Sequence, residues 1–274
     1  MDERGDPRAT GLRSSLRRRP LRWVIGAVVV AVLVAAVILT FPLAKKYTGV
    51  APPDQSDRKV QLDPALDYGR VLGVAHNAGN NLGTLDTALG AGAAVIEIDV
   101  TRARGNLAAG RDQGWPWLAE QVFLGPALTE AWDQAAGADI TKLDIKQSGH
   151  EFLGDLAEFL NERAKSRRVM VASRDPAALR YLHRRVRDVT LLYSVAFPEA
   201  VHKLKSDPGL RRIIGGVTVF QGLVDHELVS WVHEHDLKIL AWTVNEGPEF
   251  NYLVRLGVDG ITTDNLAILK ALRH

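Results

Sequence analysis

The strongest constraint on the fold is a regular alternation of strand-like and helix-like segments that begins near Gly69 and continues almost to the C-terminus. Strands that alternate with helices form parallel βαβ units. Eight such units in about 205 residues predict an α/β protein with a compact (β/α)8 TIM barrel. The strand-like runs are 71–76, 93–100, 139–146, 168–173, 189–195, 214–220, 238–244 and 259–263, and the helix-like segments are 82–90, 127–136, 150–165, 176–186, 198–206, 225–235, 247–256 and 265–273.

An open doubly wound sheet is the alternative arrangement for the same alternation. Such sheets commonly bind nucleotides through a glycine-rich loop after a strand, and no such loop follows any of the eight runs. The connection at 101–126 is the longest and lies after the second strand.

A second feature stands before the barrel. Residues 23–44 form a run of 22 residues without a charge. As a helix this run is roughly 33 Å long, enough to cross a hydrocarbon core of about 30 Å. A cleaved signal peptide is the competing interpretation, but the run exceeds the usual apolar core of such peptides and 42–44 is a poor cleavage site. A buried helix of a soluble protein is a third interpretation.

The charges around this run predict its orientation. Residues 1–22 contain seven arginines and three acids, a net charge of +4, whereas the whole chain carries +2, so the remainder carries −2. The positive-inside rule keeps the basic tail cytoplasmic. We therefore expect a cytoplasmic tail at 1–22, a single-pass transmembrane signal anchor at 23–44, a linker at 45–68 and a barrel at 69–274 on the extracytoplasmic side of the cell membrane.

Composition excludes some classes of function. The basic balance belongs to the tail alone, so it gives no reason to expect a nucleic-acid partner. The chain has no cysteine, which excludes disulfides, thiolate metal sites and thiol nucleophiles.

Acidic side chains end two of the predicted strands. Glu97 and Asp99 stand two residues apart, so they share one face of the strand at 93–100. Asp144 occupies a similar position in the strand at 139–146, and His76 ends the first strand. Two buried carboxylates on one face repel each other and lose hydration, and a divalent cation removes both penalties. Three carboxylates suit a hard cation, Mg²⁺ or Ca²⁺, better than zinc.

The same residues lie in motifs that resemble the glycerophosphodiester phosphodiesterase family. A first group comprises Val74-Ala75-His76, Gly79-Asn80-Asn81-Leu82 and the segment from Gly92 to Val100 that contains Ile96-Glu97-Ile98-Asp99. The pair Asp144 and Lys146 resembles the family's Glu-x-Lys. The C-terminal motifs are Trp242-Thr243-Val244-Asn245 and the segment from Gly257 to Asp264.

The resemblance covers residues 71–269 and implies a metal-dependent phosphodiesterase with a TIM-barrel fold. It implies that Glu97, Asp99 and Asp144 hold the metal and that His76 is one of two acid/base histidines. It further implies that Lys146 contacts the phosphate and that Trp242 forms a wall of the pocket. The expected substrates are glycerophosphodiesters or lysophospholipid-like head groups.

This chain departs from the family pattern at several positions. Arg111 stands in place of the second histidine, and it cannot exchange a proton usefully, although it can bind a phosphate in bidentate fashion. Asn77 replaces the arginine that follows the first histidine, which makes it a candidate substrate-binding residue. Gly79 replaces a glutamate, and the third ligand, Asp144, is an aspartate, as in sphingomyelinase-D-like relatives of the fold.

These departures leave two alternative functions open. One is a catalytically impaired barrel that binds anionic head groups, and the other is a phospholipase-D-like lyase that stops at a cyclic phosphate. His150 and His226 begin connections on the same rim, so either could replace the missing histidine. We expect Asp259 and Asp264 to set the turn around the last strand and to cap the last helix rather than to bind metal.

Overall fold

The computed structural model describes residues 56–110 and 125–273 of the chain. The predicted tail at 1–22 and the predicted anchor at 23–44 lie outside these residues, as does Arg111. None of the helices in the described part is both long and apolar enough to cross a bilayer.

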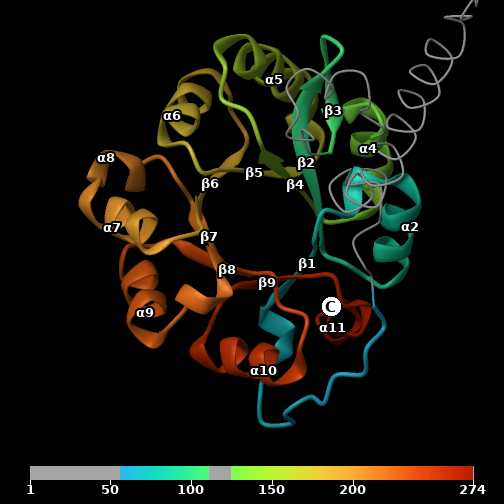
Figure 1. Cartoon of the computed structure of the whole chain (residues 1–274), viewed down its shortest axis with the longest axis vertical. Coiled ribbons are helices and arrows are strands. Elements are labelled where there is room, and N and C mark those ends of the chain that lie inside the picture. Colours follow the sequence, from blue (N-terminus) through green and yellow to red (C-terminus); the bar gives the residue numbers. More distant parts are fainter. Residues whose placement is uncertain (1–55, 111–124, 274) are drawn as a thin grey trace, which may run out of the picture. The chain divides into compact units, whose positions relative to one another are not determined.

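The described residues form a closed barrel, as the alternation predicts (Figure 1). Its ring runs β1-β9-β8-β7-β6-β5-β4-β2, and β2 pairs with β1 to close it; each neighbouring pair in this ring is parallel. The ring strands are β1 (Leu72–Ala75), β2 (Val95–Ala103), β4 (Ile140–Ile145), β5 (Arg168–Ser173), β6 (Thr190–Val195), β7 (Gly216–Phe220), β8 (Lys238–Trp242) and β9 (Gly260–Thr263).

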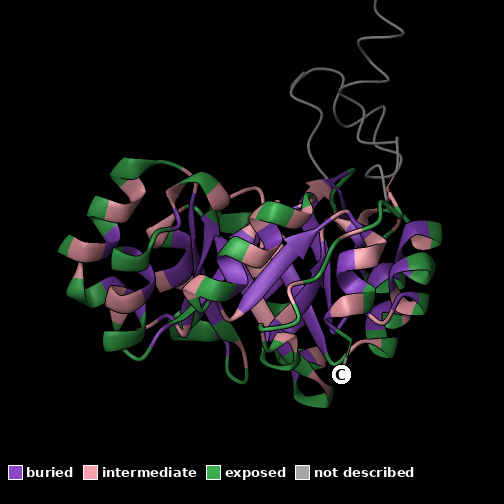
Figure 2. Ribbon diagram, turned by 90° about the horizontal axis from the view of Figure 1, so that it is seen from below, coloured by how far each residue is buried: buried purple, intermediate pink, exposed green. Residues whose placement is uncertain are grey.

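Helices surround the ring and bury one face against it (Figure 2). They are α2 (Leu82–Gly90), α4 (Leu128–Gln134), α5 (His150–Arg163), α6 (Pro176–Arg185), α7 (Pro198–Ser206), α8 (Pro208–Arg211), α9 (His226–Glu234), α10 (Gly247–Leu256) and α11 (Leu266–Ala271). Side chains such as Leu85, Trp132 and Phe250 fill the layer between helices and strands and are almost fully buried. Short 3-10 turns at Tyr68–Arg70, Ala78–Asn80, Ala135–Gly137, Ala164–Ser166 and Gln221–Leu223 complete the connections.

The structure adds one strand to the predicted eight. β2 continues to Ala103 and turns back as β3 (Asn106–Ala109), which pairs with it antiparallel. Arg104 and Gly105 form the turn with positive φ angles of 51° and 79°. The predicted loop at 101–126 therefore begins as a hairpin at the carboxyl end of the barrel.

The segment before the barrel contacts it earlier than the predicted boundary at 69. Ser56 forms a parallel bridge with Asn265, and Arg58 makes an ion pair with Glu246. The side chains of Val60, Leu66 and Tyr68 pack against the hydrophobic core. The described part of the predicted linker thus belongs structurally to the barrel.

The barrel interior has two kinds of layer. Val74, Val95, Ile140 and Leu240 form a buried apolar cluster on the inner face. Side chains two residues further along a strand point to the same side, and here they are polar: His76 follows Val74, Glu97 follows Val95, and Lys142 follows Ile140. The strand pattern therefore places a polar layer above an apolar floor, toward the carboxyl ends of the strands.

Candidate active site at the carboxyl end of the barrel

A cavity of about 240 Å³ opens into the polar layer. It is lined by side chains from five strands, β2, β4, β6, β7 and β8, and from the positions that directly follow β1, β4, β5 and β8. Among these residues are His76, Glu97, Lys142, Asp144, Lys146 and Trp242. In TIM-barrel enzymes the active site lies at this end because the loops after the strands meet there. The cavity is therefore the candidate active site.

Three carboxylates converge beside this cavity. The parallel register of β2 and β4 sets Asp99 opposite Asp144 and Glu97 opposite Lys142. Glu97, Asp99 and Asp144 each offer one oxygen, and these oxygens all lie within 4.8 Å of one another. The structure thus brings the three acids together, and their role as metal ligands stays a prediction.

Two lysines lie among the carboxylates. Lys142 is only 2% exposed, and its Nζ lies 2.9 Å from Oε1 of Glu97. Lys146 Nζ lies 2.8 Å from Oδ1 of Asp99 and also contacts Asp144. Among the described residues, the three carboxylates thus lie beside two lysines.

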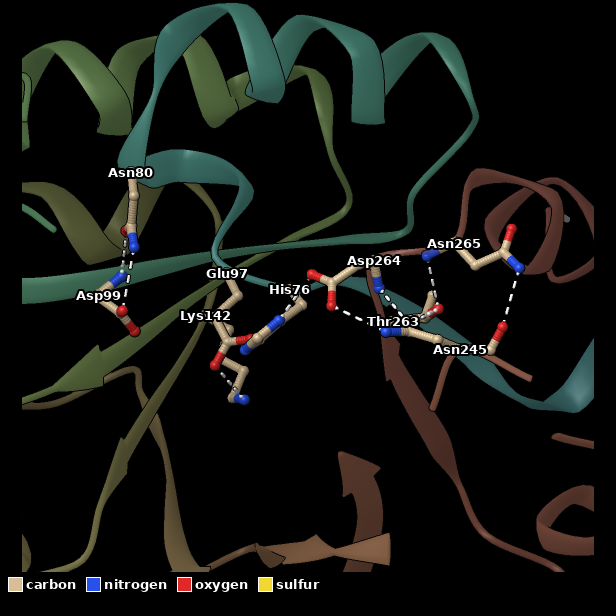
Figure 3. A network of polar contacts seen from close by, with 9 residues as sticks. All are labelled: His76, Asn80, Glu97, Asp99, Lys142, Asn245, Thr263, Asp264 and Asn265. Atoms are coloured by element: carbon tan, nitrogen blue, oxygen red, sulfur yellow. Dashed lines mark hydrogen bonds and ion pairs between the residues drawn. The ribbon is translucent and has the colours of Figure 1, made fainter. Parts of the chain in front are cut away.

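Asn80 fixes the orientation of Asp99. Its amide nitrogen donates to Oδ2 of Asp99 at 3.0 Å, and its amide oxygen accepts from the backbone N–H of Asp99 at 2.8 Å (Figure 3). The preceding Gly79 packs so closely on β2 that a Cβ there would overlap the side chain of Ile98. A glutamate at position 79 would therefore not fit in this arrangement.

The side chain of His76 is positioned by residues near the C-terminus of the chain. Its Nδ1 lies 2.8 Å from Oδ1 of Asp264, and Asn245 donates from Nδ2 to Oδ2 of Asp264 at 3.0 Å (Figure 3). The expectation that Asp264 caps the last helix is wrong, because Asn265 caps α11 by accepting from Ala267. Asp264 instead orients the imidazole through Nδ1, and the ring lines the cavity.

The surroundings shift the pKa of His76 upward. Burial lowers the pKa of the imidazole, but the hydrogen bond with Asp264 and the negative charges of Glu97 and Asp99 raise it by more. The ring therefore holds its proton more strongly than a free histidine does.

The two cavity carboxyls shift in opposite directions. Burial raises the pKa of Glu97, but the charges of Lys142 and His76 outweigh it, so the pKa lies below its ordinary value. Burial also raises the pKa of Asp144, and Lys146 opposes this only in part, so that pKa lies above its ordinary value. The ionised form of Asp144 is therefore disfavoured relative to that of a free aspartate.

The donor set fits a hard divalent cation. Oε2 of Glu97 is buried and has no hydrogen-bond partner among the described residues. An unpartnered carboxylate oxygen is costly in a buried site unless a cation or donor meets it. Together with the spacing of the three acids, this oxygen indicates that Glu97, Asp99 and Asp144 could hold Mg²⁺ or Ca²⁺.

Of the other residues predicted to act in the site, Trp242 lines the cavity, whereas Asn77, His150 and His226 do not. Trp242 lines the cavity as expected, and its indole Nε1 is buried without a hydrogen-bond partner among the described residues. Asn77 has a left-handed backbone, with φ at 52°, and does not line this cavity. His150 and His226 are exposed at the first positions of α5 and α9 and do not line it either. The role of Arg111 stays a prediction.

Several cavity residues have no counterpart among the predictions. Lys142 shares a strand face with Asp144, and this spacing of two was the signal that could have identified it. Ser194 of β6, Thr218 of β7 and Arg174, which directly follows β5, also line the cavity. The Oγ1 of Thr218 is buried without a partner in the described part of the chain, so it is a further group that could bind a substrate oxygen.

A family profile, a curated relative and solved structures were compared with the chain, and all of them match glycerophosphodiester phosphodiesterases or related phosphodiesterases. The profile of the glycerophosphoryl diester phosphodiesterase family matches residues 129–268. A curated relative from Arabidopsis thaliana, glycerophosphodiester phosphodiesterase GDPD4, is 28% identical over 113 residues. This match spans 40% of the present chain and 34% of the relative, so the chain spans about a third of the length of that protein.

Solved structures share the fold at low sequence identity. A phosphodiesterase from Oleispira antarctica, in complex with the product sn-glycerol-3-phosphate, superposes with a TM-score of 0.62 at 20% identity, covering 74% of this chain and 97% of that one. A glycerophosphoryl diester phosphodiesterase from Parabacteroides distasonis gives 0.55 at 18% identity, covering 80% and 90%. These likenesses establish the barrel.

Proposed function

The chain belongs to the glycerophosphoryl diester phosphodiesterase family, and we propose that it is a metal-dependent hydrolase of glycerophosphodiesters or lysophospholipid-like head groups. One observation carries the proposal: three carboxylates that could share a cation lie beside a single oriented imidazole in a cavity at the carboxyl end of the barrel. The resolved relative with bound sn-glycerol-3-phosphate supports the substrate class.

Glu97, Asp99 and Asp144 would hold the cation. When bound, a hard divalent ion supplies positive charge to a nonbridging phosphate oxygen and helps to orient the diester. Lys146 adds a second positive charge beside the same carboxylates. The Trp242 indole N–H and the Thr218 hydroxyl offer donors from the opposite side of the cavity.

His76 is the proposed general base. Asp264 holds Nδ1, so Nε2 takes the proton from the attacking oxygen, either water or a neighbouring hydroxyl of the substrate. Attack by the substrate's hydroxyl forms a cyclic phosphate, and the leaving alkoxide takes its proton from water, which becomes hydroxide. Hydroxide then opens the cyclic phosphate, and the departing ring oxygen takes the proton that His76 stored. One imidazole thus serves both steps.

A lyase reaction is the second candidate. Among the described residues, His76 is the one histidine that lines the cavity. A reaction that stops after the first step needs one base, and water supplies the proton to the leaving alkoxide. The product would then be the cyclic phosphate. In this family member the aspartate at position 144 also favours this outcome.

Product analysis tests these alternatives. The full-length chain is incubated with several glycerophosphodiesters and Mg²⁺ or Ca²⁺, and phosphorus NMR follows the products. A phosphomonoester indicates hydrolysis, and an accumulating cyclic phosphodiester indicates a lyase. No turnover with any diester and either cation would refute both and favour a barrel that only binds head groups.

We also propose that residues 23–44 anchor the chain in the cell membrane with the barrel on the extracytoplasmic side. The uncharged run and the arginines before it support this orientation. Protease added to intact cells should then degrade the barrel while the basic tail stays protected. A barrel released by washing membranes with high salt would contradict the anchor.

A further inference from the structure

Arg174 occupies a distinctive position on the carboxyl rim. It directly follows β5 and precedes the Asp175 cap of α6. Its side chain lines the inner cavity together with His76 and Glu97, and it also lines an adjacent outer cavity of about 350 Å³. Asp144 and Lys146 are likewise shared by both cavities, so the two spaces adjoin at the candidate metal and phosphate site.

The guanidinium of Arg174 differs from the other cavity cations. Lys142 and Lys146 are paired with the site carboxylates. No ion pair joins Arg174 to a carboxylate within residues 56–110 and 125–273, and its guanidinium carbon lies 5.9 Å from the ring centre of Trp242. A guanidinium beside an aromatic ring keeps its N–H edge available for an anion.

Most residues that line the outer cavity have polar side chains. Besides Asp144, Lys146 and Arg174, they are Gln147, Ser148, Ser173 and Asp175, together with the apolar Ile145. A diester whose phosphate lies beside Asp144 and Lys146 has two alcohol groups, and the outer cavity offers space for one of them. The polar side chains that line this cavity can bind the hydroxyl or charged groups of a hydrophilic alcohol.

On the basis of the proposed function, we propose that the outer cavity receives the head-group alcohol and that Arg174 selects its charge. An acidic head group gains a bidentate contact with the guanidinium. A cationic head group, such as a quaternary ammonium, is disfavoured for two reasons. It meets the positive charge of Arg174, and the aromatic face of Trp242 that could otherwise attract it lies beside the same guanidinium.

Asp175 is the one acidic side chain on the outer wall beyond the candidate metal ligands, and it does not reverse this selection. Its Oδ1 accepts from the backbone N–H of Ala177 at 2.8 Å as the cap of α6. The positive end of the helix dipole therefore offsets part of its charge. The exposed guanidinium remains the dominant charge available to a head group.

The size of the effect follows from Coulomb's law. A unit charge in contact with the guanidinium, about 4 Å away in a hydrated cavity with an effective dielectric constant of about 60, changes binding by roughly tenfold. The attraction of an anion and the repulsion of a cation act in opposite directions. The ratio of the two affinities should therefore change by roughly tenfold or more when the charge of Arg174 is removed.

A matched pair of diesters tests the proposal. Glycerophosphocholine ends in a trimethylammonium group, and glycerophosphoglycolate ends in a carboxylate on a two-carbon head group. Calorimetry with the full-length chain in the presence of a chelator measures binding without turnover. In the wild-type protein the carboxylate diester should bind more tightly. The variant R174Q should reduce this preference roughly tenfold, and R174K should keep its direction because the charge remains.

The control is R184Q. Arg184 is exposed in the last turn of α6 and does not line either cavity, and its substitution changes the net charge equally. It should leave the preference unchanged. An unchanged preference in R174Q, an equal loss in R184Q, or no measurable binding of either diester to the wild-type chain would overturn the proposal.

Turnover separates this proposal from the proposed function. With the cation present, kcat/KM for the two diesters should show the same preference in the wild-type chain and its loss in R174Q. Binding that follows Arg174 without any turnover would refute the hydrolase and leave the charge selection standing. Turnover of both diesters with a preference that stays the same in R174Q would refute the charge selection and leave the hydrolase standing.

Discussion

The buried lysine of the candidate site gives the sharpest test of its electrostatics. Lys142 is 2% exposed and lies 2.9 Å from Glu97. At an effective dielectric constant of about 20, that separation corresponds to an attraction of about 6 kcal/mol, much of it offset by the loss of hydration. Substitution of Lys142 by methionine removes the attraction and leaves the Glu97 charge buried.

Removal of one partner of a buried ion pair typically costs about 3 to 5 kcal/mol. We therefore expect K142M to reduce the free energy of unfolding by about that amount in the presence of a chelator. For a domain of this size each kcal/mol lowers the melting temperature by about 2 to 4 °C. Thermal denaturation followed by circular dichroism should show a decrease of roughly 6 to 20 °C.

A double variant and a surface control separate the causes. The K142M/E97Q protein should recover about half of the loss, because the uncompensated buried charge is gone. The control K238M removes an exposed lysine, 69% accessible, that pairs with Asp259 at 2.8 Å. It should cost at most about 1 kcal/mol.

The pH dependence has a defined sign. Because the pKa of Glu97 is lowered in the folded chain, the ion pair stabilises the fold above the ordinary carboxyl pKa and loses this effect as the pH falls through the folded value. The stability difference between wild type and K142M should therefore shrink under acidic conditions. A melting temperature of K142M within 2 °C of wild type at neutral pH, or a double variant no more stable than K142M, would refute the reasoning.

Three further predictions concern the chemistry. The variant E97Q should abolish metal-dependent turnover while its circular dichroism spectrum stays that of a folded chain, and unchanged turnover would exclude the site as drawn. The variant D264N should lower the pKa of His76, because Asp264 raises it, so the acid limb of the pH profile of kcat/KM should move to lower pH; a limb that moves upward would contradict His76 as the base. The variant N80A should weaken the affinity for the divalent cation by about 10- to 100-fold in calorimetry, because Asn80 orients Asp99, and an unaltered affinity would exclude Asp99 as a ligand.

The barrel could be predicted from the sequence because its signals are local. Each βα unit has its own strand run and amphipathic helix, and parallel units repeat the same pattern. The hairpin after β2 was missed because Asn106–Ala109 contains no β-branched residue and its pairing depends on the turn at Arg104 and Gly105. The number of barrel strands was therefore predictable and the added strand was not.

The candidate site was predictable only in part, because several of its contacts join residues that are far apart in the sequence. Glu97, Asp99 and Asp144 follow from strand spacing and from the meeting of strand ends at one rim. The contact between His76 and Asp264 joins residues that are 188 positions apart, and no local pattern records it. A lysine within a strand is usually exposed, so the burial of Lys142 depends on an acidic neighbour that only the register of β2 and β4 provides.

The apolar floor of Val74, Val95, Ile140 and Leu240 has a kinetic consequence. It lies below the polar layer, toward the amino ends of the strands, so we expect a diester and its products to enter and leave the candidate site at the carboxyl end of the barrel. Departing product and incoming diester then compete for one passage. A product that keeps the phosphate should therefore inhibit competitively, and turnover should depend on how quickly the mouth clears.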